Sequence, residues 1–159
     1  MIHQNRYSLR PARNGDCDGV KGVVFGVLRQ FGLATDPDGI DADMDDLEGH
    51  YWNRGGCFYV LEDSDRSIVG TVGIYALDTH TCELRKMYLL ESARGGGNGK
   101  WLLEHALEQA RALGFKRVEL ETSTVFETAK ALYRRYGFVP CDTVHFSPRG
   151  QEGFALDLK

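Results

Sequence analysis

A run of three glycines in the middle of the chain is the segment with the clearest chemical use. The stretch Arg94-Gly95-Gly96-Gly97-Asn98-Gly99-Lys100 follows an apolar, β-rich segment and precedes a helical pattern. At the start of a helix the backbone N–H groups lack helical partners, and the positive end of the helix dipole points the same way. Glycine lets an anion approach that backbone closely. The segment therefore predicts a phosphate-binding loop.

Two other phosphate loops and a purely structural turn compete with this interpretation. A dinucleotide-binding GxGxxG belongs after the first strand of its unit, with an acidic residue about 20 positions later, whereas this loop follows the fourth expected strand. A Walker loop requires Ser or Thr after its Gly-Lys, and here Trp101 follows Lys100. Taken alone, the loop is also compatible with a flexible turn rich in glycine.

The elements around the loop predict an α+β (α/β mixed) chain. Apolar spacing and turn residues give strands at 6–13, 57–62, 68–77, 82–90, 117–122, 138–139 and 154–158, and helices at 18–31, from Gly99 to about Leu113, and from about Val125 to Tyr136. Residues 35–49 are acidic and loop-like, with room for a short helix. The strands from 57 to 90 are expected to form an antiparallel meander, and the glycine loop opens a single βαβ crossover.

Two motifs in this order resemble the GNAT superfamily of N-acetyltransferases. Arg94, Gly97 and Gly99 match the family pattern Arg/Gln-x-x-Gly-x-Gly/Ala, and residues 129–138 match A-x-x-L-Y-x-x-x-G-F in full. The resemblance covers essentially the whole chain. It implies one GNAT N-acetyltransferase domain over residues 1–159, with the acyl-CoA N-acyltransferase fold: a central mixed, mostly antiparallel sheet of about seven strands flanked by about four helices.

The resemblance also implies acetyl-CoA as co-substrate and assigns its binding residues. Its pyrophosphate would lie on the backbone N–H groups of the loop, with Arg94 near the phosphates, and its pantetheine would pair with backbone groups where the fourth strand splays from its parallel neighbour. The residues so assigned are Met87, Tyr88, Leu89, Arg94, Gly95, Gly96, Gly97, Asn98, Gly99 and Lys100. Core packing is the alternative for the first three side chains, and it is compatible with main-chain contacts.

Acetyl transfer to an amine needs one group that accepts a proton and one that donates a proton. An alkylammonium titrates near pH 10, so it must lose a proton before it attacks. By resemblance Glu83 is the base and Tyr133 the acid that protonates the departing thiolate, in a direct attack within a ternary complex. A backbone N–H near Leu89 would meet the oxyanion. A surface glutamate at a strand end and a half-buried helix tyrosine are the structural alternatives.

One position departs from the family pattern. Many relatives carry Asn three residues before the Ala of the second motif, where it contacts CoA, and this chain has Phe126 there. The hydroxyls of residues 122–124 could replace that contact, but we expect them to cap the helix that follows.

The acceptor end of the site is less diagnostic. The acidic stretch 36–48 is interpreted either as a solvated loop or as a field that attracts a cationic amine. Tyr51, Trp52, Arg54 and the pair Gly55-Gly56 are candidates to line the pocket. Arg85 or Arg54 would instead suit a substrate carboxylate. These two ideas predict different substrates.

Composition bounds the remaining functions. A net charge of −4 without a basic face argues against nucleic acid. No stretch reaches the roughly 18 apolar residues of a membrane span, so we expect a cytoplasmic protein with no membrane partner. The four cysteines and five histidines have no metal-ligand spacing, and no metal is expected.

Three classes of function remain open. An N-acetyltransferase acting on a small-molecule amine or an amino acid leads, followed by a protein N-terminal or lysine acetyltransferase. A non-catalytic acyl-CoA sensor is the third, and the presence of Glu83 and Tyr133 speaks against it. A homodimer is suggested by resemblance only.

Overall fold

The computed structural model describes residues 6–142, 147 and 149–159. One seven-stranded sheet, in the order β1-β2-β3-β4-β5-β7-β6, forms its centre. The strands are β1 (Ser8–Pro11), β2 (Cys57–Glu62), β3 (Ile68–Ala76), β4 (Thr81–Leu89), β5 (Arg117–Thr122), β6 (Val139–Pro140) and β7 (Glu152–Asp157). All neighbouring pairs are antiparallel except β4 and β5. The predicted mixed sheet and the order of its elements are confirmed.

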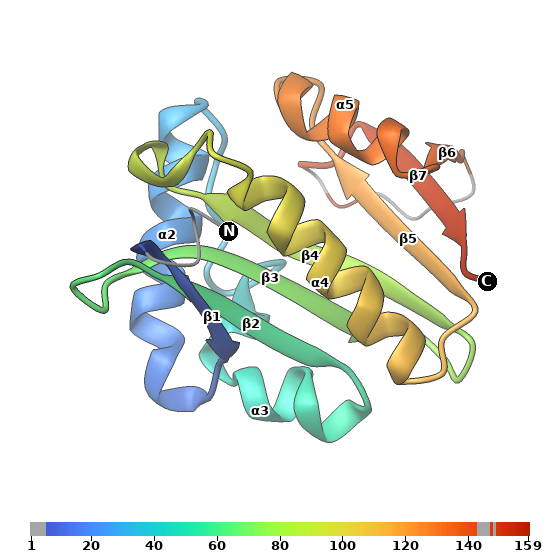
Figure 1. Cartoon of the computed structure of the whole chain (residues 1–159), viewed down its shortest axis with the longest axis horizontal. Coiled ribbons are helices and arrows are strands. Elements are labelled where there is room, and N and C mark those ends of the chain that lie inside the picture. The colour runs from blue at the N-terminus through green and yellow to red at the C-terminus, as the bar shows by residue number, and fades with distance from the viewer. Residues whose placement is uncertain (1–5, 143–146, 148) are drawn as a thin grey trace.

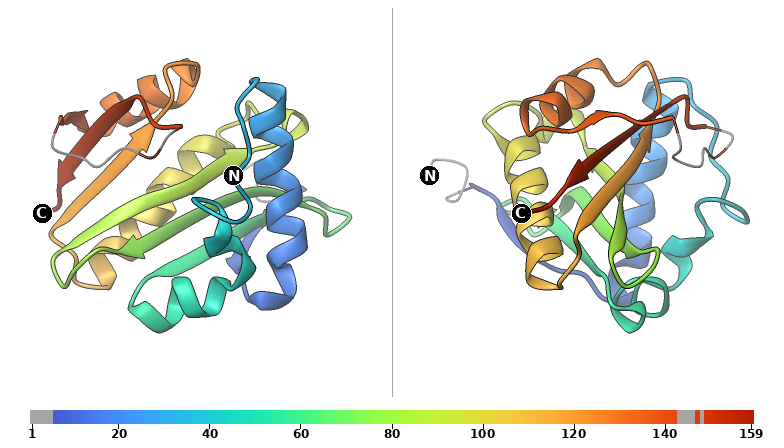
Figure 2. Two further views of the ribbon diagram at one scale, coloured as in Figure 1. Left: turned by 180° about the vertical axis from the view of Figure 1, so that it is seen from behind. Right: turned by 90° about the vertical axis from the view of Figure 1, so that its right-hand side faces the viewer.

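Helices cover both faces of this sheet. They are α2 (Cys17–Gln30), α3 (Leu47–His50), α4 (Asn98–Ala112) and α5 (Glu127–Arg135), and single 3₁₀ turns occupy Asn14–Asp16, Ala42–Asp45, Trp52–Arg54 and Glu91–Ala93. Helix α2 packs on one face of β3 and β4, and α4 packs on the other (Figure 1; Figure 2, right). The sheet is therefore the middle layer between two separate apolar cores.

Two of the helices end close to a glycine in left-handed backbone. Helix α4 is followed by Gly114 at φ 90°, and α5 by Gly137 at φ 94°. This left-handed backbone costs other residues about 1–2 kcal/mol, which is why glycine commonly ends a helix.

Strands β4 and β5 pair over only a short distance and then part. Their parallel ladder joins Thr81 to Arg117, Cys82 to Val118 and Glu83 to Glu119, and no further pair between these strands occurs in the described residues. Beyond Glu83 the two strands diverge, as Figure 1 shows. The β4 edge that faces β5 is left without sheet partners along this opening, so it can pair with something else.

A bulge bends β4 at the start of this opening. Gly73 pairs with Arg85 and Thr71 with Tyr88, so two residues of β4 stand opposite one of β3. Lys86 has φ 54°, and its carbonyl accepts a hydrogen bond from Thr71 Oγ1 at 2.6 Å. Such a bulge re-aims the side chains of its strand.

The burial of the cysteines and the character of the helices can also be described. Cys17, Cys57 and Cys82 are buried free thiols and Cys141 is partly exposed; burial raises the pKa of Cys57 and of Cys82 to about 12. Within the described residues, none of the helices has the length and apolar character that crossing a membrane requires.

Candidate active site

The glycine loop has an unusual backbone that other residues adopt at a cost. Gly95, Gly96 and Gly97 have φ angles of 80°, 64° and 88°, and α4 begins immediately after them. Within the described residues, no backbone N–H from Gly95 to Lys100 donates a hydrogen bond. Consecutive free N–H groups at the start of a fifteen-residue helix are suited to bind phosphate oxygens.

Two side chains of this segment hold the loop in place. Asn98 is 2% exposed and donates from Nδ2 to the Ala93 carbonyl at 2.9 Å. Arg94 donates from Nε to the Leu89 carbonyl and from NH2 to Gln30 Oε1, both at 3.0 Å. These bonds join the end of β4, the end of α2 and the start of α4. Any phosphate contact from Asn98 would thus come from its backbone.

A cavity of about 370 Å³ lies at the opening between β4 and β5. It brings together Glu83, Met87 and Tyr88 from β4 with Tyr133 from α5, four of the residues that the sequence singled out. Leu89 and the glycine loop are not among its lining residues; Leu89 pairs with Gly70 of β3. The cavity thus holds both candidate proton-transfer groups, and the loop follows from the same strand.

Glu83 lies in this cavity as a paired carboxylate. Its side chain is 13% exposed and accepts a hydrogen bond from Arg85 Nε. The Arg85 guanidinium lies over the Tyr75 ring, 3.6 Å from its centroid. Burial raises the pKa of Glu83, and the Arg85 charge partly opposes that rise. A raised pKa makes a carboxylate a better proton acceptor, as a general base requires.

Tyr133 is a buried phenol that keeps its proton. It is 5% exposed and packs with the rings of Phe138 and Phe154 at centroid distances of 5.7 and 6.4 Å. Its hydroxyl makes no hydrogen bond to the described residues. Burial, with a smaller contribution from Tyr88, raises the Tyr133 pKa well above its ordinary value. The group is therefore a neutral donor at the cavity wall.

Two aspartates of the acidic stretch are buried rather than solvated. Asp41 is 1% exposed and Asp43 6%. Lys86 Nζ lies 3.2 Å from Asp41 Oδ1 and 3.3 Å from Asp43 Oδ1, and Tyr51 donates a hydrogen bond to Asp43 Oδ2. For these two residues both interpretations of the stretch, as a solvated loop or as a free field for an amine, are wrong, because internal cations neutralise them.

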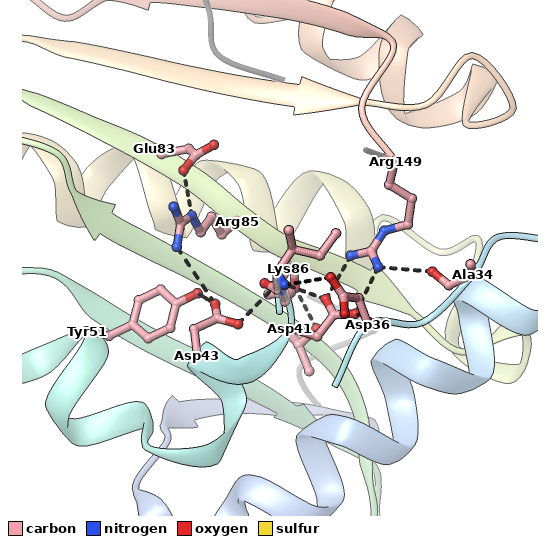
Figure 3. A network of polar contacts seen from close by, with 11 residues as sticks. Ala34, Asp36, Asp41, Asp43, Tyr51, Glu83, Arg85, Lys86 and Arg149 are labelled. Atoms are coloured by element: carbon pink, nitrogen blue, oxygen red, sulfur yellow. Dashed lines mark hydrogen bonds and ion pairs between the residues drawn. The ribbon is translucent and has the colours of Figure 1, made fainter. Parts of the chain in front are cut away.

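Arg149, from the segment before β7, completes this network (Figure 3). Its guanidinium binds both oxygens of Asp41, at 2.7 and 2.8 Å, and the Ala34 carbonyl at 3.1 Å. Although burial opposes it, the hydrogen bonds from Arg149 and from the Asp36 backbone, with the Lys86 charge, hold the pKa of Asp41 below its usual range. Segments more than 100 residues apart are thereby joined over the cavity.

Phe126 takes a structural role at the position where relatives carry Asn. Its ring packs edge-on against Phe31 and Tyr88, at centroid distances of 5.0 and 5.9 Å. The expected hydroxyl caps of α5 are wrong, because Phe126 is the N-cap and no side chain caps the helix. Ser123 and Thr124 donate instead to Gln151 Oε1, at 3.2 and 2.9 Å.

The residues on the acceptor side of the cavity are not those that the sequence analysis expected. From the region 51–56 no residue lines it; Arg54 donates to the Ala76 carbonyl instead. The lining residues that sequence reasoning did not single out include Tyr75, Lys86, Glu121, Ser147 and Arg149. Only the strand alternation of Glu119 and Glu121 carried a signal for one of them.

Comparison with known proteins gives a consistent family assignment. A model of the Acetyltransferase (GNAT) family matches residues 28–138. An N-acetyltransferase of Escherichia coli (strain K12), YjgM, named as uncharacterized, is 39% identical over 125 residues, covering 76% of this chain and 74% of its own. Human N-acetyltransferase 8B is 35% identical over 102 residues; the match covers 60% of this chain and 44% of the human protein.

Solved structures agree on the fold. An acetyltransferase of the GNAT family from Staphylococcus aureus Mu50 superimposes with a TM-score of 0.90 at 21% identity, over 96% of this chain and 99% of that one. N-acetylglutamate synthase from Neisseria gonorrhoeae, complexed with coenzyme A and N-acetyl-glutamate, has a TM-score of 0.71 at 18% identity, over 96% of this chain and 35% of that one.

Proposed function

The chain belongs to the GNAT family of acetyl-CoA-dependent acyltransferases, and from that premise we propose that it acetylates a primary amine of a small molecule or amino acid by direct attack in a ternary complex. The observation that carries the proposal is the meeting of Glu83 and Tyr133 in one cavity. That cavity opens where β4 leaves β5, on the strand that leads into the glycine loop.

Each step of the transfer has a candidate group. The amine nitrogen attacks the thioester carbonyl carbon, and Glu83 takes the proton that the nitrogen loses. The carbon–sulfur bond then breaks, and the Tyr133 hydroxyl gives its proton to the departing thiolate. The loop N–H groups from Gly95 to Lys100 would hold the pyrophosphate, and the open β4 edge at Met87, Tyr88 and Leu89 would pair with pantetheine. Direct attack needs no covalent acyl-enzyme, so the proposal assigns no role to the cysteines.

The size of the cavity supports a small acceptor. A volume of about 370 Å³ lies at the lower end of the range for small-molecule sites. Arg149 also joins the segment before β7 to Ala34 and Asp41 on the acceptor side of the cavity. A protein N-terminus or lysine is the alternative acceptor. It would need a path between these joined segments.

A panel of free amines and short peptides, with release of free CoA as the readout, tests the proposal. We expect turnover of at least one free amine, and acetyl-CoA consumption that depends on it. If only peptides are turned over, the protein-acetyltransferase alternative replaces the small-molecule one. If nothing is turned over while acetyl-CoA still binds, the chain is a sensor.

A further inference from the structure

Each lysine and arginine in the described lining of the cavity already has a carboxylate partner. Arg85 is held by Glu83, with Asp43 Oδ2 4.0 Å from its NH1. Lys86 lies between Asp41 and Asp43. Arg149 donates from its two terminal nitrogens, NH1 and NH2, to the two oxygens of Asp41. Three cations thus face three carboxylates, so the guanidinium and ammonium groups of the described lining carry no surplus positive charge to attract a further anion.

Glu121 is another carboxylate in the described lining, and none of these three cations pairs with it. It lines the same cavity from β5, past the last β4–β5 pair, and it forms no ion pair within 4 Å among the described residues. The charge of Glu121 acts on Arg149 only at longer range, where it helps to raise the Arg149 pKa. Its Oε2 accepts a hydrogen bond from the Ser147 backbone N–H at 2.6 Å. A hydrogen bond from a neutral N–H stabilises the charge without cancelling it.

The backbone around Glu121 is shaped to hold this carboxylate. A Cβ on Gly150 would lie 2.8 Å from Glu121 Cδ and from Oε2, closer than atoms can approach. Gly150 N–H donates to the Ser147 carbonyl at 3.0 Å, so the two residues that contact Glu121 are hydrogen-bonded to each other. Glycine at this position lets the turn pack directly on the carboxylate and fix its direction.

Asp43 contributes a further carboxylate to the same cavity. Asp43 Oδ1 is buried and accepts no hydrogen bond among the described residues, with Lys86 Nζ beside it at 3.3 Å. Asp43 and Glu121 both line the cavity. An ammonium group offers three donors and one positive charge, which suits the surplus carboxylate of Glu121.

We propose that the acceptor is a cationic amine without a carboxylate beside the reacting nitrogen, and that Glu121 is the residue that selects it. This inference rests on the proposed function and narrows its substrate. A substrate carboxylate would compete with Glu83, Asp43 or Asp41 for a cation that is already paired, and it would meet Glu121 as a like charge. An amine supplies the charge that the cavity lacks.

Three ligands that differ at one position separate the possibilities: phenylalanine, phenylalaninamide and phenethylamine. They carry a carboxylate, a neutral amide and a hydrogen beside the same amine. Each is titrated into the CoA-bound protein by calorimetry and then assayed for CoA release with acetyl-CoA. We expect phenylalanine to bind at least about tenfold more weakly than the other two, which should bind within about threefold of one another.

A matched pair of variants assigns the selectivity to Glu121. Glu121→Gln keeps an acceptor for the Ser147 N–H and removes the charge. We expect it to raise the Kd and KM of phenethylamine about tenfold, to reduce the preference over phenylalanine, and to leave the affinity for CoA unchanged. Glu119→Gln is the control, because Glu119 lies on the same strand, pairs with Arg117 and does not line the cavity.

The outcomes of the two proposals are distinct. Phenylalanine binding as tightly as its amide, wild-type amine affinity in Glu121→Gln, or no binding of any of the three ligands overturns the charge selection. Selective binding without any release of CoA supports the charge selection and counts against the proposed acetyl transfer.

Discussion

Arg85 donates a hydrogen bond from Nε to Oε1 of Glu83, its neighbour two positions earlier on the same side of β4. The candidate base is thus buried next to a permanent cation. Burial favours the neutral acid and the guanidinium favours the carboxylate. The two effects compete, and their balance sets the pH range in which Glu83 can take a proton from an amine.

Removing the cation should shift the pH dependence of the reaction. In Arg85→Gln the opposing charge is gone, so the pKa of Glu83 rises further and the acidic limb of kcat/KM moves to higher pH. The rate loss should therefore be larger at pH 6 than at pH 8. Initial rates from pH 5.5 to 9 measure this. Arg54→Gln is the control, since Arg54 also lies over the Tyr75 ring but does not contact Glu83. Parallel loss at every pH would contradict a role through Glu83.

The phenol of Tyr133 can be tested against Tyr136, the residue that caps the C-terminal end of the same helix. Tyr133→Phe should lower kcat about 10-fold to 100-fold, in the range of a lost general acid, with little change in the Kd of acetyl-CoA. Tyr136→Phe is the matched control, because the Tyr136 hydroxyl bonds Glu104 and Tyr136 does not line the cavity. Stopped-flow or steady-state CoA release with calorimetric Kd values separates the two effects. Unchanged turnover in Tyr133→Phe would remove it from the acid role.

The loop can be separated from general backbone strain by comparing two left-handed glycines. Gly97 and Gly114 have φ angles of 88° and 90°, and a Cβ added at either position would have no neighbour within 4 Å. Gly97→Asp and Gly114→Asp should each cost about 1–2 kcal/mol of stability. Only Gly97→Asp should also weaken CoA binding, by about 100-fold or more, because it places a negative charge at the start of α4. Calorimetry with CoA is the measurement, and equal affinities in the two variants would refute a phosphate role for the loop.

The parts of the site that the sequence predicted are those with local signals. The glycine loop, the motif at residues 129–138 and the β-rich segment that holds Glu83 can each be recognised from a few neighbouring residues. The pairing of Asp41 with Arg149 joins positions 108 residues apart, and no local charge pattern reveals it. Charge clustering therefore predicted a solvated stretch where long-range partners create a buried network.

The bulge at Lys86 could not be predicted from the sequence for a related reason. Left-handed backbone is usually marked by glycine or asparagine, and here a lysine adopts it. The Thr71 hydroxyl, which donates to the Lys86 carbonyl, lies on the neighbouring strand β3. Ion pairs to Asp41 and Asp43 hold the Lys86 side chain. Tertiary contacts thus fix a conformation that the residue type disfavours.

The buried network should contribute to stability in a pH-dependent way. Asp41→Asn leaves Arg149 and Lys86 short of a counter-charge and should lower the free energy of unfolding by about 3 kcal/mol. The exposed pair of Asp45 with Lys21 provides the control, and Asp45→Asn should change it by less than about 1 kcal/mol. Urea denaturation at pH 7 measures both.

The sign of the pH effect follows from the lowered pKa of Asp41. A carboxyl whose folded pKa is depressed stabilises the protein above its unfolded pKa, about 3.9 for Asp. That contribution is lost as pH falls through the folded pKa. The difference in unfolding free energy between wild type and Asp41→Asn should thus be constant from pH 7 to about pH 5 and should shrink on further acidification. A difference that grows below pH 4 would mean that Asp41 is not the ionised partner of Arg149.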